Sequence, residues 1–589
     1  MSKFLFAFLF ASAGLLVSAQ PGGSTKQYKE LFTEDDWNKL PQSSKDSINK
    51  LILKEFQEAR TAAETTDEAN ANQIIEDALK NPSGITSLSF TAFPKERLKD
   101  EILQFKNLEE FSCTRCRQLE LNGLFSQLAK LPKLKKVSLV NGGYKQLPDN
   151  VGKLTTLQEL NLKDNNFATL PDSFVLLKNL RVLNLEHNAY LYDEDVYARV
   201  KNLPLADLNF ANSGLFEINE KIGAVSTLKS INFSGNDIHI LPATINRLTA
   251  LQSVNLSRNL KLDLTAIVTS LSVISSLQEL NLSEAEITTL PLDISKLTNL
   301  KKLDLKGNRL TELPLTFGSL TKLEYLDLGY FEMGSRMNKI ADLTPTFGNL
   351  KKLKYLNLAG NQLAALPDAF SGLLELEELN ASLNKLVSFP VAITKLPKLK
   401  TLDLSLNNFS AVPAEISGLT SLEALNLDGN FFNKADKKIA ALPASICQLP
   451  KLKVLTLKDN VIEQLPDCFG NLTQLEKLDL RDNVLTALPA SFTQLKKLQW
   501  LDLKTNNIAQ LPADFGNLTS LKEFNFSMNP EMKYEMEKPK FMKMTQLQYL
   551  DLSYNNITKE QIEPLRAALP NCKVVNWDYN NAPLPKPKY

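Results

Sequence analysis

Few residues of this chain have side chains that commonly carry out chemistry, and they are widely spread. Five cysteines and two histidines, His187 and His239, occur among 589 residues. Cys113 and Cys116 form a C-x-x-C pair, whose spacing suits a redox couple or half of a metal site. No second C-x-x-C occurs, and the two histidines are far apart in the sequence. A four-ligand zinc set is therefore not predicted, and no other metal or cofactor is.

Catalytic signatures are also missing from the sequence. It contains no G-x-x-x-x-G-K-[ST] phosphate loop and no protein-kinase signature. A Cys-His or Ser-His site would have to use His187 or His239, both of which we interpret as surface residues. The balance of 67 basic against 66 acidic residues, net +1, leaves no general nucleic-acid footprint. We predict a protein that is not an enzyme, has no catalytic residues and binds no nucleic acid.

One repeated unit must position all of these residues. LQELNLKDNNFATLPDSFVLLKN (157–179) recurs as LKKLDLKGNRLTELPLTFGSLTK (300–322) and LEKLDLRDNVLTALPASFTQLKK (475–497). The template is L-x-x-L-x-L-x-x-N-x-L-x-x-L-P-x-x-F-x-x-L-x-x, and a fixed period of 23 residues predicts a solenoid. Its units begin at Ile85, Leu108, Leu134, Leu157, Leu180, Leu205, Leu228, Leu251, Leu277, Leu300, Leu323, Leu353, Leu376, Leu399, Leu422, Leu452, Leu475, Leu498, Leu521 and Leu547.

Each unit predicts one coil of an α/β solenoid. The L-x-L core, as in Leu160 and Leu162, alternates inward and outward residues and predicts a short strand. The template Asn, such as Asn165, Asn308 or Asn483, is expected to turn inward and satisfy backbone groups of neighbouring coils. Pro ends strand pairing because it has no N–H. The x-x-F-x-x-L tail then returns in short helical turns.

Over residues 85–589 the chain resembles leucine-rich repeat proteins. The L-P-x-x-[FI]-x-x-L return is similar to the 23-residue class of Ras-group-related and scribble-type scaffolds and of many bacterial proteins. The resemblance implies a right-handed horseshoe, with a parallel sheet on the concave face, helical turns on the convex face, and proteins bound on the concave face. The template Asn is absent at four places, where irregular turns are expected: Gly142, Ser213, Ala285 and Phe331.

The repeat also places the cysteines. Cys113 stands where the template has its third Leu, and Cys116 where it has Asn, so both are expected to face inward. We favour buried free thiols for this pair, with a local disulfide as the alternative. Cys447 and Cys468 lie in adjacent units but at offset positions, so a bridge between them is not favoured.

The chain divides into four predicted segments. Residues 1–19 resemble a cleaved secretory signal, with Lys3 ahead of the apolar run 4–17 and small residues before Gln20. Residues 20–84 are expected to form a helical cap over the first repeat, because terminal repeats need their apolar edge covered. Residues 85–571 hold about twenty repeats, and residues 572–589 close the stack and end the chain. No other stretch is long and apolar enough to span a membrane.

Candidate binding residues come from the expected concave face. The residue between the two strand leucines is nearly always Asn, Asp or Ser, and this polar row is interpreted mainly as solubility and repeat drift. It comprises, among others, Asn161, Asn232, Asp304, Asp327, Asn357, Asp403, Asp479, Asp502 and Asp551. Tyr325 and Tyr355 share one place on neighbouring strands, while Tyr330, Leu383 and Leu406 precede the Asn site. Such anchors on a water-facing sheet predict a partner site.

Two long units flank this apolar stretch. The Leu323 and Leu422 units have 30 residues each, and share Lys339-Ile340-Ala341 and Lys438-Ile439-Ala440 at matching offsets. The inserted stretches would project from one edge roughly 19 Å apart. An old duplication without function is the alternative explanation. A second candidate surface comprises Trp500 and Tyr549, with Lys458, Arg481 and Lys504 as a positive row.

These features together predict a secreted or cell-surface recognition protein that binds a macromolecule, a protein above all, on its concave face. The simple repeats resemble bacterial members more than animal receptor ectodomains, because no cysteine-rich flanking caps are present. Two alternatives stay open: a carbohydrate- or surface-binding adhesin, for which glycans are the ligand, and a translocated effector acting on host signalling. The sequence does not define the oligomeric state.

Overall fold

The computed structural model describes residues 70, 72–93, 95–98, 100–330, 337–429 and 438–577. Several predictions lie outside these residues: the signal segment 1–19, residues 20–69 of the predicted cap, Phe331, and the chain end from 578. Residues 72–79 are helical, and Ile75 and Ala78 of this helix belong to the hydrophobic core that the repeats share. No helix in the described residues is long and apolar enough to cross a membrane.

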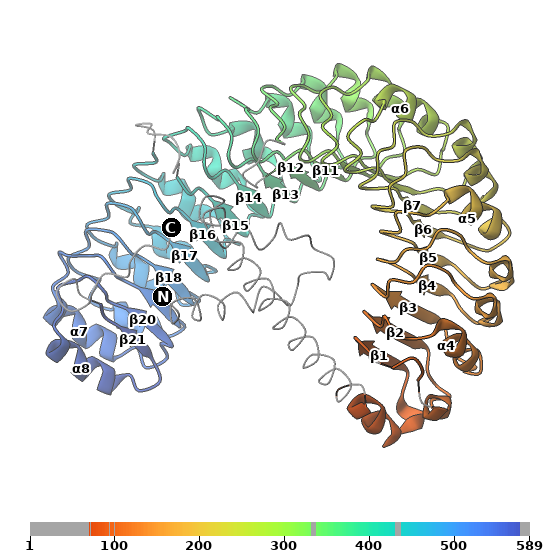
Figure 1. Ribbon diagram of the computed structural model, residues 1–589. Helices are drawn as coiled ribbons and strands as arrows, with labels where there is room; N and C mark the ends of the chain where they lie inside the picture. Colours follow the sequence, from red (N-terminus) through yellow and green to blue (C-terminus); the bar gives the residue numbers. More distant parts are fainter. Residues whose placement is uncertain are drawn as a thin grey trace, which may run out of the picture.

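The described chain is an open arc of coils with one parallel sheet along its inner side (Figure 1). Each of the 21 strands pairs in parallel with the next strand in sequence, one coil further on. The predicted right-handed leucine-rich-repeat type of horseshoe, with the sheet on the concave face and helical turns on the convex face, is therefore the observed fold class.

The strands are β1 (Ser87–Thr91), β2 (Glu110–Thr114), β3 (Lys136–Val140), β4 (Glu159–Asn161), β5 (Val182–Asn184), β6 (Asp207–Asn209), β7 (Ser230–Asn232), β8 (Ser253–Asn255), β9 (Glu279–Asn281), β10 (Lys302–Asp304), β11 (Tyr325–Asp327), β12 (Tyr355–Asn357), β13 (Glu378–Asn380), β14 (Thr401–Asp403), β15 (Ala424–Asn426), β16 (Val454–Thr456), β17 (Lys477–Asp479), β18 (Trp500–Asp502), β19 (Glu523–Asn525), β20 (Tyr549–Asp551) and β21 (Lys573–Val575).

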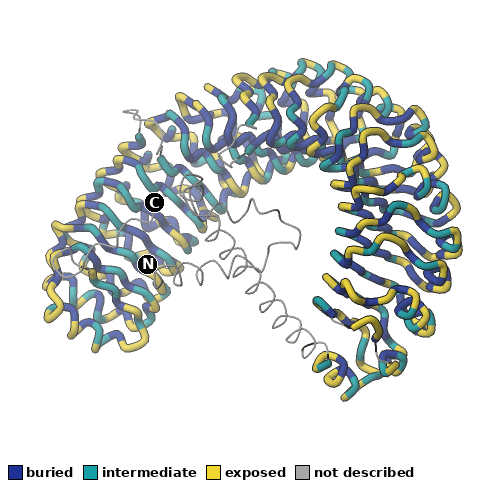
Figure 2. The backbone as a smooth tube through the Cα atoms, in the orientation of Figure 1, coloured by how far each residue is buried: buried dark blue, intermediate teal, exposed yellow. Residues whose placement is uncertain are grey.

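Strand alternation sends the template leucines into one continuous core. In β4 the middle residue Leu160 is buried while Glu159 and Asn161 are half-exposed, as a period of two requires. Leu162, the next template Leu, is also buried. Buried residues recur in every coil along the arc (Figure 2), so each coil covers the apolar faces of its two neighbours.

The outer side consists of single helical turns. A 3-10 turn usually begins directly after the template Pro, as after Pro171 and Pro314, and buries the template Phe, as Phe174 and Phe317. These turns are η2 (Pro82–Gly84), η3 (Asp100–Gln104), η4 (Asp149–Lys153), η5 (Asp172–Leu176), η6 (Glu220–Ala224), η7 (Ala243–Arg247), η8 (Leu292–Lys296), η9 (Leu315–Ser319), η10 (Pro345–Asn349), η11 (Asp368–Gly372), η12 (Val391–Lys395), η13 (Ala414–Gly418), η14 (Ala444–Gln448), η15 (Phe469–Asn471), η16 (Ala490–Gln494) and η17 (Phe515–Asn517).

α-Helices replace the turns in five coils. They are α4 (Leu121–Leu128), α5 (Asp193–Val200), α6 (Leu264–Ser272), α7 (Tyr534–Met542) and α8 (Lys559–Ala568). In Figure 1 the helices α4, α5 and α6 lie outside the sheet, on the convex side. Extra residues in these coils thus lengthen the convex return and leave the register of the sheet unchanged.

The template asparagines form a buried ladder, as the sequence predicted. The Nδ2 of Asn308 donates to the carbonyl oxygens of Leu282 and Leu305, both at 2.9 Å. Its Oδ1 accepts from the backbone N–H groups of Ala285 and Ile287 at 3.0 and 3.1 Å. One amide therefore satisfies buried backbone groups of two coils.

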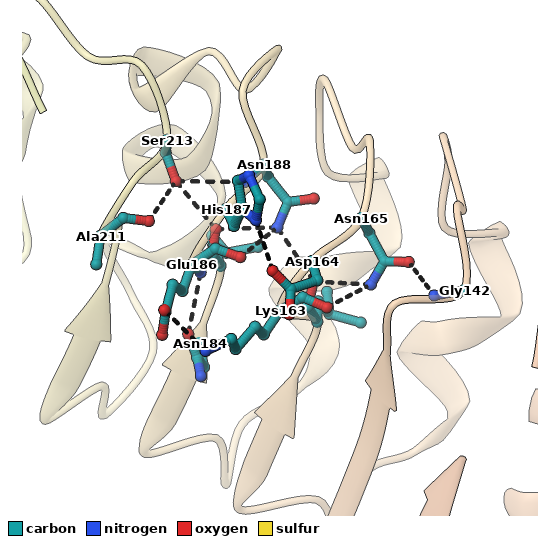
Figure 3. Close-up of polar contacts among 12 residues, drawn as sticks. Gly142, Lys163, Asp164, Asn165, Asn184, Glu186, His187, Asn188, Ala211 and Ser213 are labelled. Atoms are coloured by element: carbon teal, nitrogen blue, oxygen red, sulfur yellow. Dashed lines mark hydrogen bonds and ion pairs between the residues drawn. The ribbon is translucent and has the colours of Figure 1, made fainter. Parts of the chain in front are cut away.

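Three of the four coils without the template Asn keep the ladder by other means. Ser213 replaces the amide with a buried hydroxyl, whose one proton is shared between the carbonyl oxygens of Leu185 and Ala211, each 3.2 Å from Oγ (Figure 3). At Gly142 and Ala285 the backbone N–H donates to the Asn of the following coil. The irregular turns expected here are confirmed, because Gly143, Gly214 and Glu286, each directly after one of these places, also have positive φ, while the strand register continues unchanged.

The fourth replacement, Phe331, was assigned to the wrong place in the repeat. Asn338, seven residues later, is buried and makes the ladder bonds to the carbonyls of Leu305 and Leu328. The extra seven residues of this unit therefore precede the ladder position, and Ile340 returns to the core directly after it.

The cysteine predictions need correction. Cys113 and Cys116 face inward as expected, but they form a disulfide and not free thiols. Cys447 and Cys468 are also bridged, with Cα atoms 5.9 Å apart. The offset that argued against this bridge in fact favours it. The residue after the template Phe place in one convex turn packs against the residue before the template Phe in the turn of the next coil. A Cβ on Gly318, at the place of Cys447, would lie 2.2 Å from Thr346, at the place of Cys468.

Candidate binding surface on the concave face

Three rows of side chains cover the concave face, one residue per strand. The first row is the first residue of each three-residue strand, from Glu159 in β4 onward. The second row is the third strand residue, two positions later, and the third row is the residue two positions after that. The residue that follows the third row has positive φ in coil after coil, and we call this set the turn row.

The second row, predicted as a largely incidental polar row, has a structural role. Its Asn and Asp side chains accept the backbone N–H two residues on, as in Lys163 to Asn161 at 3.1 Å and Ser405 to Asp403 at 2.9 Å. This bond closes the turn that follows each strand. Four of its carboxylates are buried: Asp304, Asp327, Asp479 and Asp502. The row therefore does more than keep the surface soluble.

Lateral bonds join second-row neighbours where a carboxylate precedes an amide. Asn357 donates to Asp327 at 2.9 Å, Asn426 to Asp403 at 3.0 Å, and Asn525 to Asp502 at 3.1 Å. Burial nevertheless raises the pKa of Asp327 to about 6, with the charge of nearby Asp304 adding to the effect.

Tyr325 and Tyr355 are brought together as the sequence suggested. They are paired residues of β11 and β12 in the first row. Their rings are parallel within 4°, with centroids 4.5 Å apart, and both side chains are half-buried. Lys302 Nζ lies 5.0 Å from the Tyr325 ring centroid on one side, and Glu378 is the strand neighbour of Tyr355 on the other. The result is an aromatic platform between a cation and a carboxylate.

Tyr330, Leu383 and Leu406 belong to a different row from this pair. They lie in the turn row, beyond the carboxyl ends of β11, β13 and β14. Leu383 and Leu406 have φ of 52° and 54°, and both are half-buried. The Tyr330 ring lies against Gly307, where a Cβ would approach it to 3.3 Å. The predicted patch is thus two parallel strips, and we call Tyr325, Tyr330, Tyr355, Leu383 and Leu406 together the tyrosine patch.

The second candidate surface is less continuous. Lys477 Nζ lies 4.6 Å from the Trp500 ring centroid, and Lys573 Nζ lies 6.0 Å from that of Tyr549. The two aromatic residues are separated by β19, whose first-row residue is Glu523.

The predicted positive row of this surface is partly neutralised. Lys458, Arg481 and Lys504 do share the third row of β16 to β18. The Arg481 guanidinium, however, lies 2.9 Å from the carboxylate of Asp479. Asp459 and Asp482 stand next to this row in the turn row.

Both histidines lie at the surface. His187 Nδ1 is 2.6 Å from Asp164, and the neighbouring Lys163 and Glu186 form an ion pair at 2.8 Å (Figure 3). The His239 ring bonds the backbone carbonyl of Lys261. Among the described residues, no group of three or more His, Cys, Asp or Glu could hold a metal ion.

One concave feature escaped sequence reasoning. A hollow of about 290 Å³ opens over β4 to β7, lined by Glu159, Asn161, Val182, Leu183, Asn184, Asp207, Leu208, Asn209, Ser230 and Asn232. Its signal was present as six successive second-row asparagines: Asn161, Asn184, Asn209, Asn232, Asn255 and Asn281.

A parallel sheet closed by an asparagine ladder, one strand per coil, defines a solenoid repeat protein. Two family models match it: "Leucine-rich repeat region" at residues 87–203 and 437–576, and "Leucine rich repeat" at residues 275–330, 337–386 and 388–432. Together the matches cover more than half of the chain. The chain belongs to the leucine-rich repeat family.

Solved structures similar to this chain include a leucine-rich repeat protein of Leptospira interrogans, 26% identical, covering 85% of this chain and 98% of its own, with a TM-score of 0.49. The plant peptide hormone receptor RGFR1 in complex with RGF2 is 24% identical, with 84% and 90% covered and a TM-score of 0.44. An internalin of Listeria monocytogenes is 20% identical, with 70% and 95% covered and a TM-score of 0.36. No curated protein matches the chain.

Proposed function

We propose that this protein is a non-enzymatic recognition protein that binds a protein partner on its concave face, at the tyrosine patch. The observation that carries the proposal is the stacked pair of Tyr325 and Tyr355 on a water-facing sheet. Large aromatic surfaces that are ordered but still half-exposed are the usual anchors of protein interfaces. The family resemblance points to the same face.

The patch is organised before any partner arrives. Ring stacking, the parallel sheet and the Asn357–Asp327 bond beneath it fix both tyrosines. Binding a partner would therefore cost little conformational entropy in this protein. Lys302 and Glu378 at the two ends favour a partner with opposite charges in the matching order, which would set its direction along the sheet.

We further propose that the protein acts outside the cytoplasm. The predicted signal segment 1–19 implies export. Two disulfides in the described residues support this placement, because such bonds persist in oxidising compartments. The proposed site is thus one that extracellular proteins can reach.

The test is affinity capture from the native extracellular milieu with the mature chain as bait. Tyr325→Ala/Tyr355→Ala is compared with the wild type and with Tyr190→Ala/Tyr192→Ala, in which two tyrosines that are each 68% exposed are removed outside the sheet. We expect the first variant to lose at least one partner that the other two baits retain. A captured set that is identical for all three baits would refute the tyrosine patch as the site.

A further inference from the structure

The hollow over β4 to β7 lies on the concave face, apart from the tyrosine patch, and has no evident role in holding the fold together. We propose that the second-row asparagines of β4 to β9 form a binding site for an uncharged, extended polysaccharide, separate from the tyrosine patch. The ligand class follows from which hydrogen-bonding groups this arc presents, how they are oriented, and which groups it lacks.

The orientation of the amides is fixed by the backbone. Oδ1 of Asn184, Asn232 and Asn255 accepts the N–H of Glu186, Ser234 and Ser257, each at 3.0 Å. Only the oxygen end of an amide can accept this bond, so Nδ2 must turn to the concave side. Asn281 has the same arrangement with Ser283 at 2.9 Å.

Most of these Nδ2 groups donate no hydrogen bond to the residues that the structure describes. In the ranges that the structure describes, Nδ2 of Asn184, Asn232, Asn255 and Asn281 has no hydrogen-bond acceptor, whereas that of Asn161 donates to Ser138 Oγ at 3.1 Å and that of Asn209 to Glu186 at 3.4 Å. Neighbouring strands stand ~4.8 Å apart, so these four donors lie on one line at multiples of this spacing, with a gap at β6. One extended pyranose unit has a similar length, which lets successive sugars meet successive strands.

Acceptors stand beside the donors. The first row of the same arc carries the carboxylates of Glu159, Asp207 and Glu279. A sugar hydroxyl donates one hydrogen bond and accepts others, so neighbouring hydroxyls can serve a carboxylate and an amide at once. The third row adds the half-buried hydroxyl of Ser234, whereas Ser257 and Ser283 in the same row are buried.

The composition of the arc argues against other ligand classes. Its first and third rows hold four carboxylates against one ammonium, Lys163, which disfavours nucleic acids and acidic glycans. No aromatic residue occurs in the three rows of β4 to β9, and Val182 is the one large apolar side chain of the first row. A protein partner would find no anchor there.

The test uses titration calorimetry with β-1,4-linked hexasaccharides of glucose, N-acetylglucosamine, xylose and mannose, and heparin as the acidic comparison. The site variant is Asn184→Asp/Asn232→Asp. Aspartate fits this place without loss of the turn bond, since Asp304 and Asp403 accept the same backbone N–H at 3.1 and 2.9 Å. The substitution thus removes the donor and retains the fold.

We expect at least one neutral hexasaccharide to bind, and its affinity to fall at least tenfold in the site variant. The matched control is Asn380→Asp, at the same place in β13 and outside the arc, with an affinity within twofold of the wild type. Tyr325→Ala/Tyr355→Ala should also bind the sugar normally, so this result stands apart from the fate of the tyrosine patch. Binding of heparin alone, no binding of any neutral probe, or equal affinity in the site variant would each overturn the proposal.

Discussion

The arcs β4–β9 and β10–β20 share one sheet and one turn geometry but present different chemistry to the concave side. The first arc has asparagine at every second-row place, whereas the second arc has aspartate at six: Asp304, Asp327, Asp403, Asp479, Asp502 and Asp551. Both side chains accept the backbone N–H that closes the turn. The fold therefore fixes one oxygen per strand and leaves the other atom of the amide or carboxylate free to vary.

The first-row residues also differ between the two arcs. The tyrosine pair, Trp500 and Tyr549 all lie in the second arc, while the first arc has none of these anchors. A solenoid can vary its concave face strand by strand because that face contributes little to the core, which the template leucines fill. Two binding surfaces of unlike chemistry on one rigid wall are a natural result.

The largest expected effect tests what the two arcs share. Asn259→Ala in the first arc and Asn506→Ala in the second remove matched ladder amides, each bonded to two carbonyls and one N–H at 2.9–3.0 Å. Buried backbone groups left unpaired should cost roughly 2–4 kcal/mol of unfolding free energy in either arc. Urea unfolding followed by circular dichroism measures the loss.

The half-exposed second-row variant Asn380→Ala serves as the control and should cost less than ~1 kcal/mol. Unequal losses for Asn259 and Asn506 would break the view that one scaffold underlies both arcs.

The ladder and the sheet are also the parts of this molecule that the sequence could predict. A template with Leu at fixed places defines both the strand and its buried side, and the Asn at the ninth place has one evident use. The same template put Tyr325 opposite Tyr355 because both occupy its third place. Each of these inferences needs only the position of a residue within one unit.

Features that depend on how coils lie against each other escaped prediction. The Cys447–Cys468 bridge needs the lateral shift between convex turns, which no single unit reveals. Asn338 was missed because seven extra residues separate it from its template place. Non-glycine residues such as Asp164 and His187 hid the positive φ of the turn row. The run of second-row asparagines was visible in the sequence, but the hollow that four of them line depends on the local shape of the sheet.

A second prediction contrasts the two disulfides. The Cys447–Cys468 bridge spans 21 residues and the Cys113–Cys116 bridge spans 3. Closing the longer loop restricts the unfolded chain more, so Cys447→Ser/Cys468→Ser should lose about 3 kcal/mol and Cys113→Ser/Cys116→Ser about 2 kcal/mol. Urea midpoints without reductant measure both.

Adding reductant to the wild type should reproduce the loss seen in the double variants. If Cys113→Ser/Cys116→Ser is less stable than Cys447→Ser/Cys468→Ser, then packing around Cys113 and Cys116, and not loop closure, controls the result.

The smallest expected effect concerns Asp327, a buried second-row carboxylate of the second arc. Burial raises the pKa of Asp327 to about 6, above its ordinary value of 3.8. The folded chain therefore binds more protons than the unfolded chain between about pH 4 and 6, so this group lowers stability as pH rises through that window. In the wild type the N–H of Gly329 donates to Asp327 Oδ1 at 2.9 Å. Asp327→Asn keeps an oxygen for this bond and removes the charge.

We expect Asp327→Asn to melt about 1–3 °C above the wild type at pH 8, and the difference to vanish near pH 4. The reciprocal variant, Asn357→Asp, replaces the amide that donates to Asp327 with a second carboxylate. It should melt below the wild type at pH 8 and recover on acidification, because like charges at this distance disfavour ionisation of both groups. Melting shifts that are the same at both pH values would mean that the aspartates of the second arc differ from the asparagines of the first in hydrogen bonding alone, and not in buried charge.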